Sequence, residues 1–451
     1  MYGLNSSIPL NVAGIIIPTN INVVREVLTH KSMEDFNKGF AYTIAHPLIG
    51  NSVLPTSREA WAVQRPIVER GFAHDVVGRS IPKIVKTVNE LASKWEATAR
   101  LTNNTGIQNV REDMLKLTMD VIGRAAFGFD FNSTSSDVAP LYGPFQTILL
   151  TLERRSILMQ EHVLRNLPLE RNIKFDQAIG KLDELVDAIQ HQRRTETPED
   201  KAKREVDFLD MLIKDQAMSP ELVKDNIKTL LFAGHDTTGA ALAWFLYLLA
   251  KHPDCLKRAR EEIIQTFGEH GDPTYDGLES VHYLNACLLE TLRLYPSAGF
   301  MRRARNYVEI GGYSLPRFCE ILFLPYLLQR DERYWGSTAN EFIPDRFLNE
   351  GFEQSQQLDA ERSASFRMDS LQSRIARISK DKAYFPFSLG PRNCVGRPLA
   401  LTELRVVAIK LLQKFTFKLC EDKDFAEVPL LTLTLNPKSI RLIPVLAAEF
   451  Q

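Results

Sequence analysis

The chain has 451 residues, of which 44% are hydrophobic and 25% are charged, a balance that excludes a disordered or fibrous protein and allows a large buried core. Its 55 basic and 56 acidic residues give a net charge of -1, so nothing in the charge predicts a nucleic-acid partner. The five cysteines are odd in number and contain no C-x-x-C pair, which argues against a disulfide framework or a zinc or iron–sulfur site and favours a reducing environment.

The N-terminal part predicts small elements followed by an open segment. Residues 2–20 predict two short strands around a turn, and residues 22–30 predict a helix. The apolar run 8–17 is too short and too interrupted for a signal peptide or a membrane anchor. Residues 36–56 carry several helix breakers and therefore predict a loop.

The next helix covers residues 58–72, and Ser57 before it can act as its cap. In this helix Trp61 and Arg65 are four residues apart and therefore share one face. That face could bind an anion. A cation stacked on an aromatic ring at helical spacing is also common without any ligand, and the residues alone favour that second interpretation.

Apolar residues at helical spacing predict scaffold helices at 84–100, 109–128 and 175–194. Between the last two, residues 137–170 mix helical patterning with prolines. Residues 195–206 are strongly charged, and we expect them to form a surface loop.

The longest apolar run, 229–250, carries polar residues at its middle, which favours a buried central helix over a membrane span. Gly234 and Gly239 each cost roughly 1 kcal/mol relative to alanine inside a helix, so another group is expected to approach the backbone there. Asp236 and Thr237 place an acid beside an alcohol. Such a pair can relay protons, or it can be a capping pair displaced into a hydrophobic run, and the residues alone leave both interpretations open.

A strong helical pattern at 281–296 places Glu290 and Arg293 three residues apart, within ion-pair reach. Exposed pairs of this kind contribute about 0 to 1 kcal/mol and are common, so the pair alone indicates little. Residues 307–316 and 320–328 predict strands, and a glycine pair within the first predicts a hairpin turn.

The segment 385–396, FPFSLGPRNCVG, places Cys394 between glycines and after an arginine. Gly390 permits a tight turn, Gly396 lets the backbone approach the sulfur, and Arg392 supplies a fixed cation. A helix with a proline in its first turn follows, so the cysteine precedes a helix N-terminus, whose dipole favours a thiolate. A thiolate there would hold a soft metal, whereas an isolated loop cysteine is more often packed as a small hydrophobe.

Five positions of this segment reproduce the spacing Phe-x-x-Gly-x-Arg-x-Cys-x-Gly of the cytochrome P450 family, namely Phe387, Gly390, Arg392, Cys394 and Gly396. In the family that the chain thus resembles, the matching cysteine is the axial thiolate ligand of haem iron, which favours cleavage of the O–O bond. The resemblance spans essentially the whole chain. It implies a single, mainly helical domain over residues 1–451 with a small β part, in which haem lies between the central helix and the loop of Cys394.

The resemblance implies that the cofactor is haem b and that several basic residues bind its propionates. Trp61 and Arg65 match the family's Trp-x-x-x-Arg, whose side chains donate to a propionate. A further propionate-binding arginine maps to Arg302 or Arg303, because the alignment needs a one-residue gap.

The central helix matches the family's oxygen-activation motif. This match assigns Gly234 to the cofactor site and makes Asp236 and Thr237 the catalytic acid and alcohol. Behind the haem, the family has a buried network that here would consist of Glu290, Arg293 and Arg346. A buried network of this kind would lose several kcal/mol when one partner is removed.

Some features depart from the family or lie outside its motifs. Gln329 stands where a histidine is common, and we expect no effect on the chemistry. Residues 349–382 are longer than the matching family loop and predict a polar surface insertion. Substrate-facing side chains are expected from four segments, 36–56, 140–168, 298–301 and 431–435.

The implied activity is that of a monooxygenase that inserts one oxygen atom from O2 into a lipophilic organic substrate, with electrons from NADPH through a flavoprotein reductase. The residues of these motifs, together with the insertion, suggest by resemblance a microsomal, fungal enzyme of secondary metabolism at the endoplasmic reticulum membrane. The chain starts where such members usually carry an anchor and a first helix, so it resembles a truncated form, and a cytosolic or peripheral protein is the alternative. A peroxide-rearranging or dehydrating member and a haem-binding protein without turnover are the rival functions, and the retention of Asp236 and Thr237 argues against the first.

Overall fold

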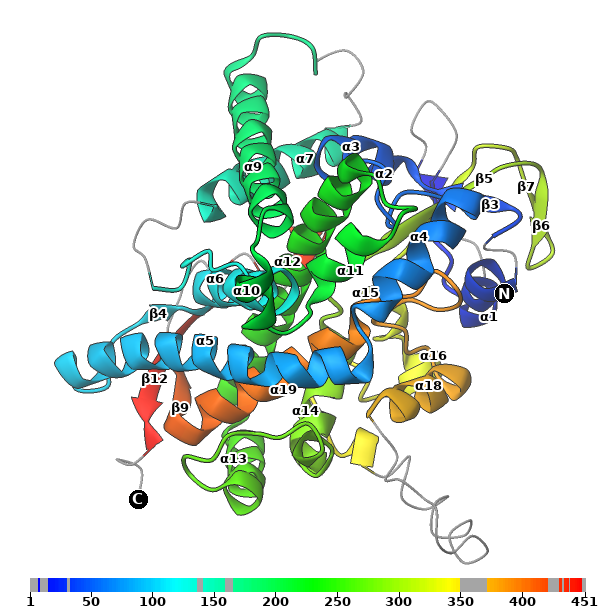
Figure 1. Ribbon diagram of the computed structural model, residues 1–451. Coiled ribbons are helices and arrows are strands. Elements are labelled where there is room, and N and C mark those ends of the chain that lie inside the picture. The colour runs from blue at the N-terminus through cyan, green and yellow to red at the C-terminus, as the bar shows by residue number, and fades with distance from the viewer. Residues whose placement is uncertain are drawn as a thin grey trace, which may run out of the picture.

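The longest helix of the described residues, α12 (Pro220–Lys251), passes through the middle of the molecule (Figure 1). It begins after Ser219, whose side chain accepts a hydrogen bond from the Leu222 N–H, and a proline fills the first turn. The computed structural model describes residues 7–8, 15–30, 33–135, 141–158, 165–348, 371–420, 430–431, 434–437 and 439–447. Over these residues the protein is mainly helical with small sheets, which confirms the expected fold class.

Further helices precede and follow α12 in the sequence. Those before it are α1 (Ile21–Arg25), η1 (Glu26–His30), α2 (Phe40–Ile44), α3 (His46–Ile49), α4 (Arg58–Arg70), α5 (His74–Leu101), α6 (Val110–Ile122), η2 (Gly123–Phe127), α7 (Tyr142–Leu158), α9 (Glu170–Arg194), α10 (Pro198–Ala202) and α11 (Phe208–Lys214). Those after it are α13 (Pro253–Phe267), η3 (Gly277–Glu279), α14 (His282–Leu294), α15 (Pro325–Leu328), α16 (Glu332–Trp335), α18 (Leu371–Asp381) and α19 (Arg397–Lys414). Within the part of the chain that is described, none of the helices combines the length and apolar character that crossing a bilayer requires.

Helix α6 packs against α12 at the two glycines of the central helix. A Cβ atom built on Gly234 would lie 3.1 Å from the Ile122 side chain, and one on Gly239 would lie 2.9 Å from the Leu115 side chain. In the same contact the Thr118 hydroxyl donates to the carbonyl oxygen of His235 at 2.8 Å. The prediction that another group approaches this backbone is therefore confirmed, and the group is a neighbouring helix.

The largest sheet has the strand order β1-β2-β8-β5-β3. Its strands are β1 (Ser7–Ile8), β2 (Ile15–Ile16), β3 (Phe36–Lys38), β5 (Phe300–Ala304) and β8 (Glu320–Phe323). Strand β5 lies between β3 and β8, and the register places Lys38 opposite Arg302. This sheet therefore brings a basic residue of the N-terminal part beside one of the two arginines that the sequence left unresolved.

The remaining strands form three small sheets. They are β6 (Val308–Ile310) with β7 (Tyr313–Leu315), β10 (Leu430–Leu431) with β11 (Leu435–Asn436), and the order β4-β12-β9, made of β4 (Gln108–Asn109), β12 (Arg441–Leu446) and β9 (Phe415–Leu419). The β6–β7 turn contains Gly311 and Gly312 with φ values of 56° and 81°, as the predicted hairpin requires.

The prediction of a loop at residues 36–56 is wrong, because β3, α2 and α3 lie there. Pro47 occupies the first turn of α3, and Gly50 ends that helix with a φ of 49°. Both residues thus delimit a helix. Helices of four and five residues are too short to produce a detectable apolar period.

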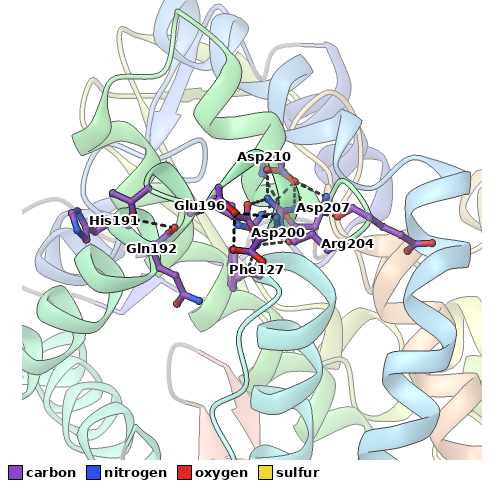
Figure 2. Close-up of polar contacts among 12 residues, drawn as sticks. Phe127, His191, Gln192, Glu196, Asp200, Arg204, Asp207 and Asp210 are labelled. Atoms are coloured by element: carbon purple, nitrogen blue, oxygen red, sulfur yellow. Dashed lines mark hydrogen bonds and ion pairs between the residues drawn. The ribbon is translucent and has the colours of Figure 1, made fainter. Parts of the chain in front are cut away.

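The charged segment 195–206 is also more ordered than a solvated loop. It contains α10, and Arg204 joins it to α11 by donating to Glu196 and, at 2.6 Å, to Asp210 (Figure 2). Arg193 at the end of α9 donates to Asp207 at 2.6 Å and to the Phe127 carbonyl oxygen at 2.7 Å. This cluster of ion pairs, which also appears in Figure 2, fastens the connection between α9 and α11.

The predicted surface insertion 349–382 is described only in part. Residues 349–370 lie outside the described residues. The part that follows forms α18, whose Leu371, Ile375 and Ile378 are buried. Because this helix buries an apolar face, the description of the whole segment as a polar surface insertion is wrong for residues 371–381.

Candidate active site

The loop that carries Cys394 precedes α19. Its backbone closes on itself, since the Cys394 N–H donates to the Phe387 carbonyl oxygen at 2.9 Å. Gly390 has a φ of 70°, and a Cβ there would lie 2.1 Å from a backbone oxygen of η1, so only glycine fits. At Gly396, the N-cap of α19, a Cβ would meet only the Phe72 ring among the described residues, at 3.8 Å. Packing within the chain therefore requires the first glycine and leaves room at the second.

The Cys394 thiol is accessible from one side and packed by protein on the others. Its side chain is exposed, yet desolvation by the surrounding protein raises its pKa. The N–H groups of Gly396 and Arg397, and the charges of Arg65 and Arg397, act in the opposite direction. The expected stabilisation of a thiolate by the helix N-terminus is thus present, although desolvation outweighs it in the protein alone.

Four cations from separate elements form a cluster beside this loop: Lys38 of β3, Arg65 of α4, Arg302 of β5 and Arg392. Burial, followed by the charges of Arg302 and Arg65, lowers the pKa of Arg392 to about 9. Burial and the three arginines lower the pKa of Lys38 well below its ordinary value. Within the described residues no carboxylate forms an ion pair with Lys38, Arg302 or Arg392, whereas Arg65 reaches the exposed Glu69 at 3.4 Å. The cation cluster therefore carries surplus positive charge.

Arg302 and Arg303 point to opposite sides of β5, as neighbouring strand residues do. Arg302 is only 2% exposed and donates to its neighbour's backbone, the Met301 carbonyl oxygen, at 3.0 Å. It belongs to the cation cluster and lines a small pocket with Lys38 and Arg392. Arg303 instead forms an ion pair with Glu320 on β8. The structure thus separates two candidates that the sequence could not distinguish, and it favours Arg302.

Trp61 and Arg65 lie on one face of α4, as their spacing predicts. The cation that stacks on Trp61, however, is Arg392, whose guanidinium carbon lies 4.9 Å from the ring centre. Arg65 donates to the backbone and side-chain oxygens of Asn393, at 2.7 and 2.9 Å. Arg392 also donates to the Thr56 carbonyl oxygen at 2.7 Å. These contacts fix α4 against the loop of Cys394.

Asp236 and Thr237 lie at the middle of α12, but no hydrogen bond between their side chains is found in the described part of the chain. The Thr237 hydroxyl donates to the Ala233 carbonyl oxygen, one turn earlier, at 2.7 Å. The Asp236 side chain is 2% exposed and accepts hydrogen bonds from Thr434 and Asn436 of the C-terminal hairpin. The acid and the alcohol are therefore held by different parts of the protein.

The predicted buried network is present. Arg293 donates to Glu290 at 2.6 and 2.8 Å, and both side chains are fully buried. Arg346 donates to the same carboxylate at 3.2 Å. Gln329, to which the sequence assigned no role, donates to the Leu292 and Arg293 carbonyl oxygens at 3.0 Å and accepts the Phe385 N–H at 2.8 Å. This glutamine ties α14 to the segment that enters the Cys394 loop.

The site residues fit a haem. A thiol before a helix N-terminus is a suitable soft donor for iron, and surplus positive charge beside it suits two propionates. Lys38 was missed by the sequence reasoning because it lay in the supposed loop. Gly234 was assigned to the cofactor site, but its contact with Ile122 already accounts for a glycine there, and its role toward haem stays a prediction. The assigned functions of the other site residues remain predictions as well.

Comparisons with known proteins agree with this geometry. The sequence model of the family described as Cytochrome P450 matches residues 6–444. The chain is 30% identical over 457 aligned residues to an 11-oxo-beta-amyrin 30-oxidase of Glycyrrhiza uralensis, covering 97% of this chain and 79% of the relative. It is 27% identical to an echinocystic acid 23-monooxygenase of Saponaria officinalis, with coverage of 97% and 80%, and 26% identical to a cytokinin hydroxylase of Arabidopsis thaliana, with coverage of 93% and 76%. These relatives are plant proteins, so the expectation of a fungal enzyme is not supported.

Proposed function

The chain belongs to the cytochrome P450 family and is a P450 monooxygenase, and on this premise we propose that the Cys394 thiolate would hold its haem iron. The proposal rests above all on one observation. The thiol lies before the N-terminus of α19, beside a cation cluster whose charge the described carboxylates do not neutralise. When bound, haem with a thiolate ligand supplies the activation of O2 and the cleavage of its O–O bond.

The protein's own residues bind the cofactor, exclude water and deliver protons. Lys38, Arg65, Arg302 and Arg392 bind the propionates, since paired anions relieve the mutual repulsion of these cations. Trp61 supports Arg392 by stacking. The network of Glu290 holds the segment that enters the cysteine loop through Gln329.

Insertion of one oxygen atom of O2 into the substrate would release the other as water, and this consumes the two electrons of NADPH together with two protons, one of which comes from the solvent. The Thr237 hydroxyl can hold and pass a proton at its Oγ1, and the Asp236 carboxylate is the nearest acid on the same helix. The electron donor is an NADPH-dependent flavoprotein reductase. The monooxygenase acts at the endoplasmic reticulum membrane, as a single domain over residues 1–451.

The substrate is a lipophilic organic molecule of secondary metabolism. The printed names of two relatives denote oxidation of 11-oxo-beta-amyrin and of echinocystic acid, and a third denotes hydroxylation of a cytokinin. These names support oxidation at carbon. A comparison of metabolites after deletion of the gene would identify the compound that accumulates.

The test measures product formed and hydrogen peroxide released per NADPH consumed, with a reductase and that substrate. Removing the Thr237 hydroxyl in Thr237→Ala should leave NADPH consumption largely intact and divert reduced oxygen to peroxide. Asp236→Asn should slow turnover itself, because proton supply is interrupted. A protein that binds haem but oxidises NADPH no faster with any substrate would instead be a haem-binding protein without turnover.

A further inference from the structure

The Asp236 carboxylate is held by the C-terminal β10–β11 hairpin. The Thr434 hydroxyl donates to its Oδ2, and the Asn436 amide donates to Oδ1 and Oδ2 at 3.2 and 3.3 Å. All three side chains are buried, with 2%, 3% and 5% of their surface exposed. A buried carboxylate is costly unless donors satisfy it, so these contacts are needed for the acid to lie where it does.

The three side chains are linked in series by hydrogen bonds that end at the Asp236 carboxylate. The Asn436 amide also donates to the Thr434 oxygen at 2.7 Å. Because a threonine hydroxyl has only one proton, accepting this bond leaves that proton to be directed at Asp236. The arrangement therefore fixes both the position of the carboxylate and the direction of the Thr434 hydroxyl.

Two other titratable groups lie near the acid. His235, its neighbour on α12, has its Nδ1 at 2.7 Å from the Leu231 carbonyl oxygen, so this nitrogen carries the proton, and within the described part of the chain its buried Nε2 has no hydrogen-bond partner. Burial, with a smaller contribution from the charge of Asp236, raises the pKa of Tyr142 on α7 to about 12. Both groups are neutral near pH 7, since burial also lowers the pKa of His235. The direct hydrogen-bond donors to the acid are therefore the two hairpin residues.

We propose that Thr434 and Asn436 are positioning residues for Asp236, which hold its carboxylate in place and in one orientation and so link proton supply to the placement of the C-terminal hairpin. This inference rests on the proposed function, in which Asp236 supplies protons for the reaction. Sequence reasoning expected this segment only to face the substrate.

The experiment measures turnover, KM and the solvent isotope effect on turnover in the haem-loaded enzyme with reductase and a substrate. The variants are Thr434→Val and Asn436→Asp, each close in shape to the residue it replaces, with Asp236→Asn as reference. Turnover should fall about tenfold with an unchanged KM, and the solvent isotope effect should increase, because proton supply becomes slower.

A matched control separates positioning from general damage to the fold. Asn285 of α14 is also a buried asparagine, its side-chain oxygen has no hydrogen-bond partner among the described residues, and it lies on a different helix from the acid. Asn285→Asp should destabilise the protein without changing the isotope effect. In the background of Asp236→Asn, the hairpin substitutions should have little further effect on turnover.

The outcomes distinguish the inference from the function on which it rests. If Asp236→Asn keeps the wild-type rate and isotope effect, the proposed acid role itself fails. If Asp236→Asn slows turnover but Thr434→Val and Asn436→Asp keep the wild-type rate and isotope effect, the positioning role is overturned and the hairpin contact is purely structural.

Discussion

The two neighbouring arginines of β5 should respond in opposite ways to the same substitution. Arg302 is buried within the cation cluster and donates to the Met301 carbonyl oxygen and to Tyr42, which leaves other N–H groups of its guanidinium for an anion. A hydrogen bond to a charged group contributes about 1.5–3 kcal/mol, so Arg302→Gln should speed haem loss by roughly 10- to 100-fold. The apoprotein should keep its stability, because the substitution also removes repulsion from Lys38 and Arg392.

Arg303→Gln is the matched control. It leaves the Glu320 carboxylate, which is 5% exposed, with the Phe40 N–H as its remaining donor. An unpaired buried group costs about 1–3 kcal/mol, so the apoprotein should be less stable while haem is retained as in the wild type. Haem transfer to an excess of apo-globin gives the loss rate, and urea unfolding of the apoproteins gives the stability. Equal haem loss in both variants, or loss only in Arg303→Gln, would refute the assignment of Arg302.

Three further predictions concern stability, each measured by urea unfolding of the variant against the wild type. Burial raises the pKa of Glu403 well above its ordinary value, so the wild type loses stability as pH rises above the unfolded pKa, by up to about 1.4 kcal/mol per unit. Glu403→Gln should remove this loss, and an advantage that is the same at pH 5 and pH 7 would contradict the reasoning. Arg204, with the Asp207 N–H, outweighs burial and lowers the pKa of Asp210, which stabilises the protein above the unfolded pKa and ceases to do so as pH falls (Figure 2). Arg204→Met should therefore cost about 1 kcal/mol at pH 7 and less at pH 3, whereas a constant cost would mean that the charge is irrelevant. Arg293→Met should cost about 3–5 kcal/mol because it leaves a fully buried carboxylate, and a cost below 1 kcal/mol would show that the network is dispensable.

Local sequence patterns predicted correctly those features that residues within a single helix or turn determine. The apolar period predicted α5, α6, α9 and α12, although α5 begins earlier than expected. The glycine pair of the β6–β7 hairpin and the proline of α19 are signals that act within a few residues. The glycines of α12 correctly indicated a close approach, because a glycine inside a helix needs a reason.

The features that the sequence did not predict depend on contacts between residues that are far apart in the chain. Which of Arg302 and Arg303 faces the cation cluster follows from the strand register, and one residue of uncertainty exchanges the two faces. Lys38 joins the cluster only because β3 pairs with β5. The hairpin partners of Asp236 are 198 and 200 residues away, and no period or spacing connects them.

The central claim is that Cys394 is the thiolate ligand of the haem iron, and the ferrous carbonyl spectrum tests it most directly. Thiolate donation produces the red-shifted absorption band of the family, so the wild type should show this band and Cys394→His should lose it while still binding haem. Cys255 of α13 offers the control, since Cys255→His should keep the band. If Cys394→His retains the red-shifted band, another residue ligates the iron and the assignment of this site is wrong.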